Sequence, residues 1–238
     1  MRKYQNPFRM LSFIEWVILA VSLIAVCVSF LAVPSRDVLT LFASLAGVVA
    51  LIFVAKGDPL GQILTVVFAI LYSIVSVSFR YYGEMITYAF MSAPMAALSA
   101  ISWFRHPYKE GKNEVRIESV SPLRWAILSV LTSLVTFIFY FILKFFGTAN
   151  LPVSTLSIAT SFLAASLTFL RSPYYALAYA ANDVVLIVMW ILASLYEPSY
   201  FPMIICFAAF LLNDIYGFFN WRRMRRRQAR SVSGESDK

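Results

Sequence analysis

The chain has 238 residues, of which 61% are apolar and only 13% are charged, and its formal net charge is +8. Its mean hydropathy is +0.76, a value that excludes a soluble globular domain of this length. The sequence therefore indicates an all-α integral membrane protein. We looked for apolar runs of about 20 residues, the length of helix that crosses a ~30 Å hydrocarbon core.

Eight such runs follow one another, separated by short stretches that carry turn formers or charges. The first run follows Arg2, Lys3 and Arg9, as in a signal peptide, but it is too long for one and no Ala-x-Ala-like cleavage site follows. We therefore expect it to be a retained helix. The eight expected helices cover residues 13–33, 38–55, 60–79, 82–104, 124–146, 152–170, 174–195 and 200–221.

The basic residues are distributed unevenly between the two ends of these helices. With the amino terminus in the cytoplasm, all of the twenty Lys and Arg residues except Arg36, Arg80 and Lys144 lie on the cytoplasmic side, as the positive-inside rule requires. We expect both termini in the cytoplasm and a location in a bacterial cytoplasmic membrane. The basic run at 222–227 follows the last helix directly, so we interpret it as an anchor on anionic membrane lipid and not as a nucleic-acid site.

The sequence also contains an internal repeat. A shift of 118 residues superposes Tyr72 on Trp190 and Trp103 on Trp221. We predict two parallel three-helix repeats joined by one helix, a 3+1+3 arrangement that carriers use to hold a substrate near the membrane midplane. The predicted segments are an N-terminal cytoplasmic segment with a peripheral helix (1–36), the first repeat (37–104), a basic loop with the connector helix (105–151), the second repeat (152–221) and a basic cytoplasmic tail (222–238).

Two acidic-amide steps, Asn182-Asp183 and Asn213-Asp214, lie inside apolar runs. A charged side chain at that depth costs roughly 2.5–3.5 kcal/mol, so such residues usually face a bundle interior or a cavity. The 3.6-residue period of an α-helix places further polar and aromatic side chains on the same helix faces as these Asn-Asp pairs. Similar side chains follow the same spacing on the matching helix of the other repeat. The candidate substrate-binding residues are Gln62, Thr65, Tyr72, Asn182, Asp183, Trp190, Asn213, Asp214 and Tyr216.

These candidates would form a polar pocket with aromatic walls. Carboxylate and amide oxygens accept hydrogen bonds from sugar hydroxyls, and Trp and Tyr faces stack on a heterocycle. A positively charged ring would gain further from cation–π contact. Because no basic residue lies deep in the apolar runs, we expect a neutral or cationic small-molecule ligand and not a phosphorylated one.

Three classes of function remain open from the residues alone: a solute carrier, a membrane-embedded enzyme and a structural or assembly protein. The sequence has no Walker-type loop, no His-Glu-x-x-His helix and no Gly-x-Ser-x-Gly turn, so we expect no enzyme, no cofactor and no metal site. A carrier predicts that the polar stripes converge on one cavity, whereas a structural protein predicts polar residues scattered over helix contacts.

Other polar and aromatic residues have simpler interpretations. Trp103 and Trp221 fall near the cytoplasmic boundary, where aromatic rings usually belong to the interfacial belt. Glu15 is expected to be solvated near the inner boundary, and Glu84 to be solvated or to line a vestibule near the outer surface. Pro94 lacks a backbone N–H and is expected to bend its helix.

Several stretches resemble the PnuC family of vitamin transporters. They are Ala181–Val185 continuing to Trp190, Leu212–Trp221 and Trp103–Lys109. The resemblance covers most of the chain and matches Asp183 and Trp190 to the acidic and aromatic positions of a family helix. Asn213, Tyr216 and Trp221 match the family's final helix.

The resemblance implies a carrier that imports nicotinamide riboside by facilitated diffusion with alternating access. It also implies a SWEET-like fold, a homotrimeric assembly and metabolic trapping of the substrate by a cytosolic kinase. Related members carry thiamine or riboflavin, so another vitamin or a sugar remains an alternative substrate, and a non-transport membrane scaffold remains the alternative function.

Overall fold

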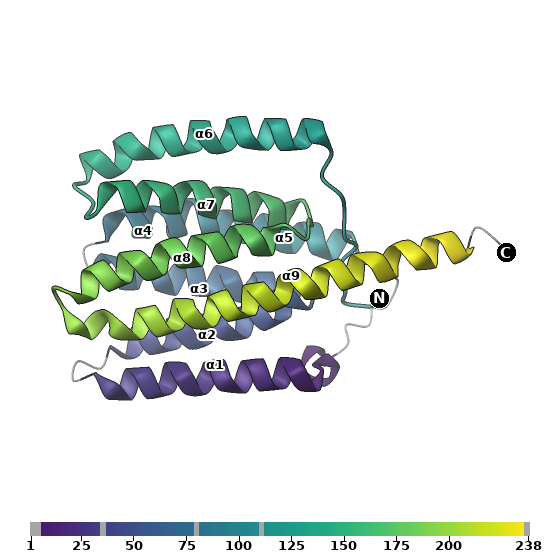
Figure 1. The fold of residues 1–238 in the computed structure, drawn as a ribbon, viewed down its shortest axis with the longest axis horizontal. Coiled ribbons are helices and arrows are strands. Elements are labelled where there is room, and N and C mark those ends of the chain that lie inside the picture. The colour runs from purple at the N-terminus through teal and green to yellow at the C-terminus, as the bar shows by residue number, and fades with distance from the viewer. Residues whose placement is uncertain (1–5, 34–36, 79–80, 110–111, 236–238) are drawn as a thin grey trace.

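The computed structural model describes residues 6–33, 37–78, 81–109 and 112–235, and these form a bundle of helices (Figure 1). Eight helical stretches among them are long and apolar enough to cross a membrane, which confirms the predicted multi-pass all-α fold. The elements are η1 (Pro7–Met10), α1 (Phe13–Ala32), α2 (Val38–Ala55), α3 (Pro59–Ser78), α4 (Tyr82–Thr87), η2 (Tyr88–Ser92), α5 (Ala93–Arg105), α6 (Pro122–Phe145), α7 (Leu151–Phe169), α8 (Tyr175–Ser194), η3 (Pro198–Tyr200) and α9 (Phe201–Glu235).

Polar caps mark where several of these helices begin. Ser12 and Glu15 form a capping box at the start of α1, in which each side chain accepts a hydrogen bond from the other residue's backbone N–H. Asp37 accepts from the backbone N–H of Leu39 at the start of α2. Gly57, with φ +71°, provides the left-handed turn just beyond α2.

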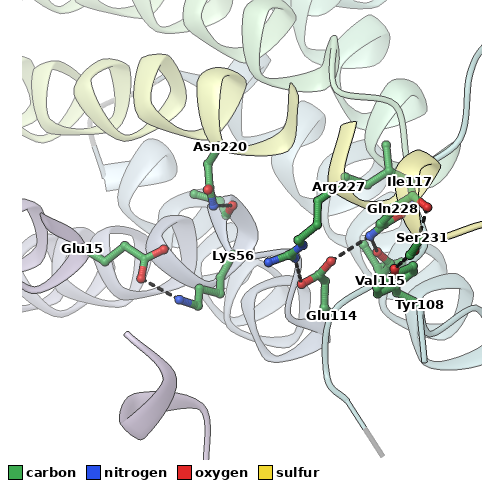
Figure 2. Close-up of polar contacts among 11 residues, drawn as sticks. Glu15, Lys56, Tyr108, Glu114, Val115, Ile117, Asn220, Arg227, Gln228 and Ser231 are labelled. Carbon is green, nitrogen blue, oxygen red and sulfur yellow. Dashed lines mark hydrogen bonds and ion pairs between the residues drawn. The ribbon is translucent and has the colours of Figure 1, made fainter. Parts of the chain in front are cut away.

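The last helix differs most from its predicted span. The apolar run ends at Trp221, but α9 continues to Glu235 and projects beyond the bundle (Figure 1), because arginine is a good helix former even where it ends an apolar run. The loop between α5 and α6 packs on this extension. Gln228 donates from Nε2 to the carbonyl oxygen of Val115 at 3.0 Å and accepts from the backbone N–H of Ile117 at 2.9 Å (Figure 2).

The span from Tyr82 to Arg105 is not a uniform α-helix. Residues Tyr88–Ser92 form a π-helical turn in which the N–H of Ala93 donates to the carbonyl of Tyr88. Pro94 follows immediately and cannot donate the next backbone hydrogen bond. The irregularity expected from Pro94 therefore takes the form of a π-bulge in the preceding turn.

Helices α8 and α9 pack side by side in the bundle. Helix α2 contacts α3 and α9, α8 contacts α7 and α9, α6 lies against α7, and α1 lies against α2 and α9. In Figure 1, α6 and α1 lie on opposite sides of the bundle. Helix α9 is therefore covered by α8 on one side and by α1 and α2 on another.

The placement of Trp103 and Trp221 in an interfacial aromatic belt was wrong. Both side chains are completely buried, and their ring centroids lie 5.3 Å apart. The Nε1 of Trp103 donates to the carbonyl of Thr168 at 3.1 Å, and that of Trp221 to the carbonyl of Val54 at 3.0 Å. Each tryptophan thus ties its helix to the last turn of a helix far away in the sequence.

Two acidic residues are also more buried than their positions in the sequence indicate. Glu15 is 2% exposed, and its carboxylate accepts from Lys56 Nζ at 2.7 Å (Figure 2) and from the Tyr216 hydroxyl at 2.9 Å. Glu84 is 1% exposed and accepts from the Ser157 hydroxyl at 3.2 Å. The expectation that either residue is solvated was wrong, because neighbouring helices cover both.

Candidate functional site

A cavity of about 50 Å³ lies inside the bundle, where α2, α3, η2, α7, α8 and α9 meet. Its walls combine hydroxyl, amide and carboxyl groups with aromatic rings and small residues. A volume of this size holds only a few water molecules. The polar residues and tyrosines of its lining are Gln62, Thr65, Tyr88, Ser92, Ser161, Tyr179, Asn182, Asp183 and Asp214.

Five of the nine residues predicted to bind substrate line this cavity. Gln62 and Thr65 reach it from α3, Asn182 and Asp183 from α8, and Asp214 from α9. Residues far apart in the sequence therefore converge on one internal space. This arrangement is the one that a carrier predicts and a scattering of structural contacts does not.

Asp183 and Asp214 form a pair of facing acids. Each residue is 3% exposed, and the two carboxyl groups lie close enough to interact directly. The Oδ2 atom of Asp183 has no hydrogen-bond partner in the described part of the chain. None of the described residues that line the cavity is Lys, Arg or His, so the protein provides no positive charge at this wall.

The amide of Asn182 is oriented by two hydroxyl groups of α7. Its Oδ1 accepts from Thr160 Oγ1 at 2.8 Å and from Ser161 Oγ at 3.0 Å. Because the oxygen is occupied in this way, the Nδ2 group, which can only donate, is the part of the amide that can serve a ligand.

An aromatic wall of Phe68, Tyr88 and Phe210 forms part of the cavity lining. Phe68 contacts Tyr88 and Phe210 edge to face, with centroid distances of 5.8 and 5.2 Å. Gly47 on α2 makes room for this wall, since a Cβ atom at that position would lie 2.3 Å from Cζ of Phe210. The glycine therefore allows the ring to approach the α2 backbone closely.

Tyr72 and Trp190 lie behind this wall and do not line the cavity. Trp190 Nε1 donates to the Tyr72 hydroxyl at 3.1 Å, and both side chains are completely buried. The Tyr72 ring packs against Tyr88 and Phe68 at centroid distances of 4.4 and 5.5 Å. In this conformation Tyr72 and Trp190 therefore pack behind the residues that line the cavity.

The structure places Asn213 and Tyr216 away from the cavity. Asn213 Nδ2 donates to the Ser22 hydroxyl of α1 at 3.4 Å, and the Tyr216 hydroxyl donates to Glu15 on the same helix. Successive residues of an α-helix point about 100° apart. Asp214 therefore faces α8 and the cavity, while Asn213 and Tyr216 face α1.

Several lining residues were missed by reasoning from the sequence. Tyr179 lies four residues before Asp183 and hence on the same helical face, a signal that could have identified it. Tyr88 belongs to the π-bulge, which shifts the register of the face and could not be located from periodicity. Among the described residues, no three His, Cys, Asp or Glu side chains are grouped closely enough to hold a metal ion.

The chain is similar to known membrane transporters. A family model described as "Nicotinamide mononucleotide transporter" matches residues 37–223. Two similar proteins are both named nicotinamide riboside transporter PnuC. The one from Neisseria mucosa is 22% identical over 191 residues, which cover 79% of this chain and 73% of the relative. The one from Haemophilus influenzae is 24% identical over 214 residues, which cover 90% of this chain and 91% of the relative.

A solved structure has the same fold. The crystal structure of the vitamin B3 transporter PnuC superposes with a TM-score of 0.80 and 22% sequence identity. The superposition covers 92% of this chain and 94% of the crystallised chain. The match therefore extends over nearly the whole helical bundle.

Proposed function

Because the chain belongs to the nicotinamide mononucleotide transporter family, a family of membrane transporters and not of enzymes, we propose that it imports nicotinamide riboside. Both curated relatives are named for that riboside. The observation that carries the proposal is the charge of the cavity, where Asp183 and Asp214 face each other and no described lining residue is basic. The nicotinamide ring of the riboside is a cation, whereas the mononucleotide adds an anionic phosphate that this wall would repel.

The lining residues suit the parts of such a ligand. Asp183 and Asp214 provide carboxylate oxygens for the cationic ring or the ribose hydroxyls, and the Nδ2 group of Asn182 donates to an oxygen acceptor. Gln62 and Thr65 add polar contacts from α3. The wall around Phe68 and its aromatic neighbours offers faces on which the ring can stack.

The proposal includes a parallel 3+1+3, SWEET-like repeat with α1 outside it. Two reciprocal contacts support it: Trp103 bonds to the last turn of α7, and Trp221 bonds to the last turn of α2. The left-handed residues Gly57 and Arg171 occupy matching places after α2 and α7. The hydrogen bond between Tyr72 and Trp190 joins residues that the shift of 118 superposes.

Transport by this arrangement requires movement of the helices. Ligand pockets usually measure about 300–1,000 Å³, whereas the cavity here has about 50 Å³. We propose that the two repeats rock about the cavity and open it alternately to either side. In the absence of a nucleotide-binding motif in the sequence, facilitated diffusion is the simplest mode of transport.

The proposal also covers location and assembly. Figure 1 shows η1 and the basic extension of α9 at the same end of the bundle, which supports a cytoplasmic membrane location with both termini in the cytoplasm and arginines near anionic lipid. A homotrimer rests on the family resemblance. The outward-facing apolar surfaces of α1 and α6 are available for contacts between subunits.

Binding to the purified protein tests the substrate. Tryptophan fluorescence is recorded while nicotinamide riboside, nicotinamide mononucleotide, thiamine, riboflavin or a hexose is added. Saturable binding of the riboside but not of the mononucleotide supports the proposal, and binding of the mononucleotide with equal affinity contradicts it. Thiamine is the second candidate, because it too carries a positively charged ring that the acid pair would accept.

A further inference from the structure

No described Lys, Arg or His forms an ion pair with the facing acids Asp183 and Asp214. Both lie at membrane depth and line the cavity, and one oxygen of Asp183 is left without a hydrogen-bond partner in the described residues. A buried polar atom without a partner is costly unless something else in the working cycle provides one. A positive species at the pair would provide such a partner.

The described groups around the pair include no basic side chain. The titratable groups that face the pair are Tyr175 and Tyr179 on α8, Tyr88 on η2 and Cys206 on α9. The lining residues of α2, α3 and α7 do not titrate. Glu15 and Glu84, the other buried acids named above, bond to α2, α9 and α7 partners outside the cavity.

We propose that a proton and the cationic ring of the ligand compete for the Asp183–Asp214 pair, so that binding of a cationic ligand releases a proton. The inference rests on the proposed function and deepens it. Two carboxylates in contact repel each other, and either a shared proton or an adjacent cation removes the repulsion. Both use the same oxygen atoms, so one excludes the other.

The charges balance through this exchange. The pair with one shared proton carries a charge of −1, the arriving ring carries +1, and the departing proton leaves through the side to which the cavity is open. The site with its ligand then keeps the charge of −1 that it had before. By linkage, the affinity for a cationic ligand falls as the pH is lowered, by up to about tenfold per pH unit for one exchanged proton. A neutral ligand of the same shape displaces no proton.

A matched pair of ligands tests the exchange on the full-length protein. Nicotinamide riboside is a cation, while its reduced dihydro form is neutral and keeps the same ribose and carboxamide. Dissociation constants are measured for both between about pH 5 and pH 8, where one exchanged proton gives up to about tenfold per unit. We expect the dissociation constant of the riboside to rise as the pH falls and that of the reduced form to stay constant.

Two variants locate the effect. Asp214→Asn keeps the shape of the pair but removes one acid, so the pH dependence of riboside binding should disappear even if its affinity is lower. Glu84→Gln removes another buried acid and should leave the pH dependence in place. Proton release on binding is followed with an indicator dye in weakly buffered solution, and it should be present in the wild type and absent in Asp214→Asn.

The possible outcomes distinguish a failure of the proton exchange from a failure of the proposed function. Failure of the riboside to bind at any pH contradicts the proposed function. Binding of equal strength at every pH, without proton release, overturns the exchange and leaves the function standing. An equal pH response for the charged and neutral ligands, or a response that disappears in Glu84→Gln, also overturns it, because the titrating group would then lie elsewhere.

Discussion

The same dipeptide, Asn-Asp, occurs in α8 and in α9, and the two copies have different surroundings. In α8, Asn182 and Asp183 both line the cavity. In α9, only Asp214 does so, while Asn213 donates a hydrogen bond to Ser22 on α1. An Asn-Asp dipeptide inside a membrane helix is therefore not a binding site by itself. The helices packed against each residue determine whether it lines the cavity or bonds to another helix.

The difference follows from how the two helices are covered. Helix α9 lies between α8 and the pair α1 and α2, so it needs polar contacts on two faces. Tyr216 and Asn220 continue the face that begins at Asn213, and they meet α1 and the end of α2, respectively. The cavity face of α9 carries Phe210 and Asp214 four residues apart. Variants on each face can test this division.

The largest effect is expected for Asp183→Ala. Removing one member of a buried charged contact typically costs about 2–5 kcal/mol of binding free energy, so the riboside should bind roughly 30- to 4,000-fold more weakly. The unliganded protein should melt at the same or a higher temperature, because an unpartnered buried oxygen is removed. Titration calorimetry and a melting curve measure the two quantities.

Val184→Ala is the matched control for this variant. Val184 is the next residue of α8 but is half exposed on the outer surface, so its truncation should not change the affinity. A loss of binding in this control, or a strongly lowered melting temperature in Asp183→Ala, would show that folding and not ligand contact explains the result.

The second prediction compares Asn213 and Asp214, the two residues of the Asn-Asp pair in α9. Asp214→Ala should weaken binding by about 2 kcal/mol or more, like Asp183→Ala. Asn213→Ala should leave the affinity unchanged and lower the stability by about 0.6 kcal/mol, the average of hydrogen bonds between membrane helices. Binding and melting curves of both variants provide the comparison. Equal losses of affinity would mean that both residues of the step serve the ligand.

The third prediction concerns the cavity face of α9. In Gly47→Ala the new Cβ atom would lie 2.3 Å from Cζ of Phe210, so the ring must move. Such overpacking typically costs about 1–3 kcal/mol of stability. The displaced ring should also lower the affinity for the riboside. Combining Gly47→Ala with Phe210→Leu should restore part of the melting temperature, because Cδ2 of Phe68, 2.9 Å from the new Cβ atom, must still move. A double variant that is no more stable than the single one contradicts this account of the glycine.

The sequence predicts the helices well because the membrane imposes their length. Apolar runs, turn formers and charges place the helix ends within two residues everywhere except at the end of α9. It also identifies Gln62, Thr65, Asn182, Asp183 and Asp214 as lining residues, since polar groups at that depth need an interior.

The remainder of the site could not be predicted from one sequence. A polar face of a helix can form hydrogen bonds with a neighbouring helix as well as with a ligand. Periodicity alone therefore could not show that Tyr216 bonds to Glu15. Tyr72 and Trp190 share a face with lining residues but lie one layer behind them. The position of Tyr88 depends on a π-bulge, which shifts the helical register after Thr87.

The last variant, Tyr216→Phe, tests the face of α9 that contacts α1, and it should change the stability but not the ligand affinity. The Tyr216 hydroxyl donates to Glu15 at 2.9 Å, and Glu15 also accepts from Lys56. Loss of one hydrogen bond to a charged group typically costs about 1.5–3 kcal/mol, but the ion pair with Lys56 remains, so we expect a loss of stability near the lower end of that range. The affinity for the riboside should not change, because this hydroxyl faces α1. A melting curve and a binding titration on one preparation measure the stability and the affinity. Weaker binding of the riboside would mean that both faces of α9 contribute to the site.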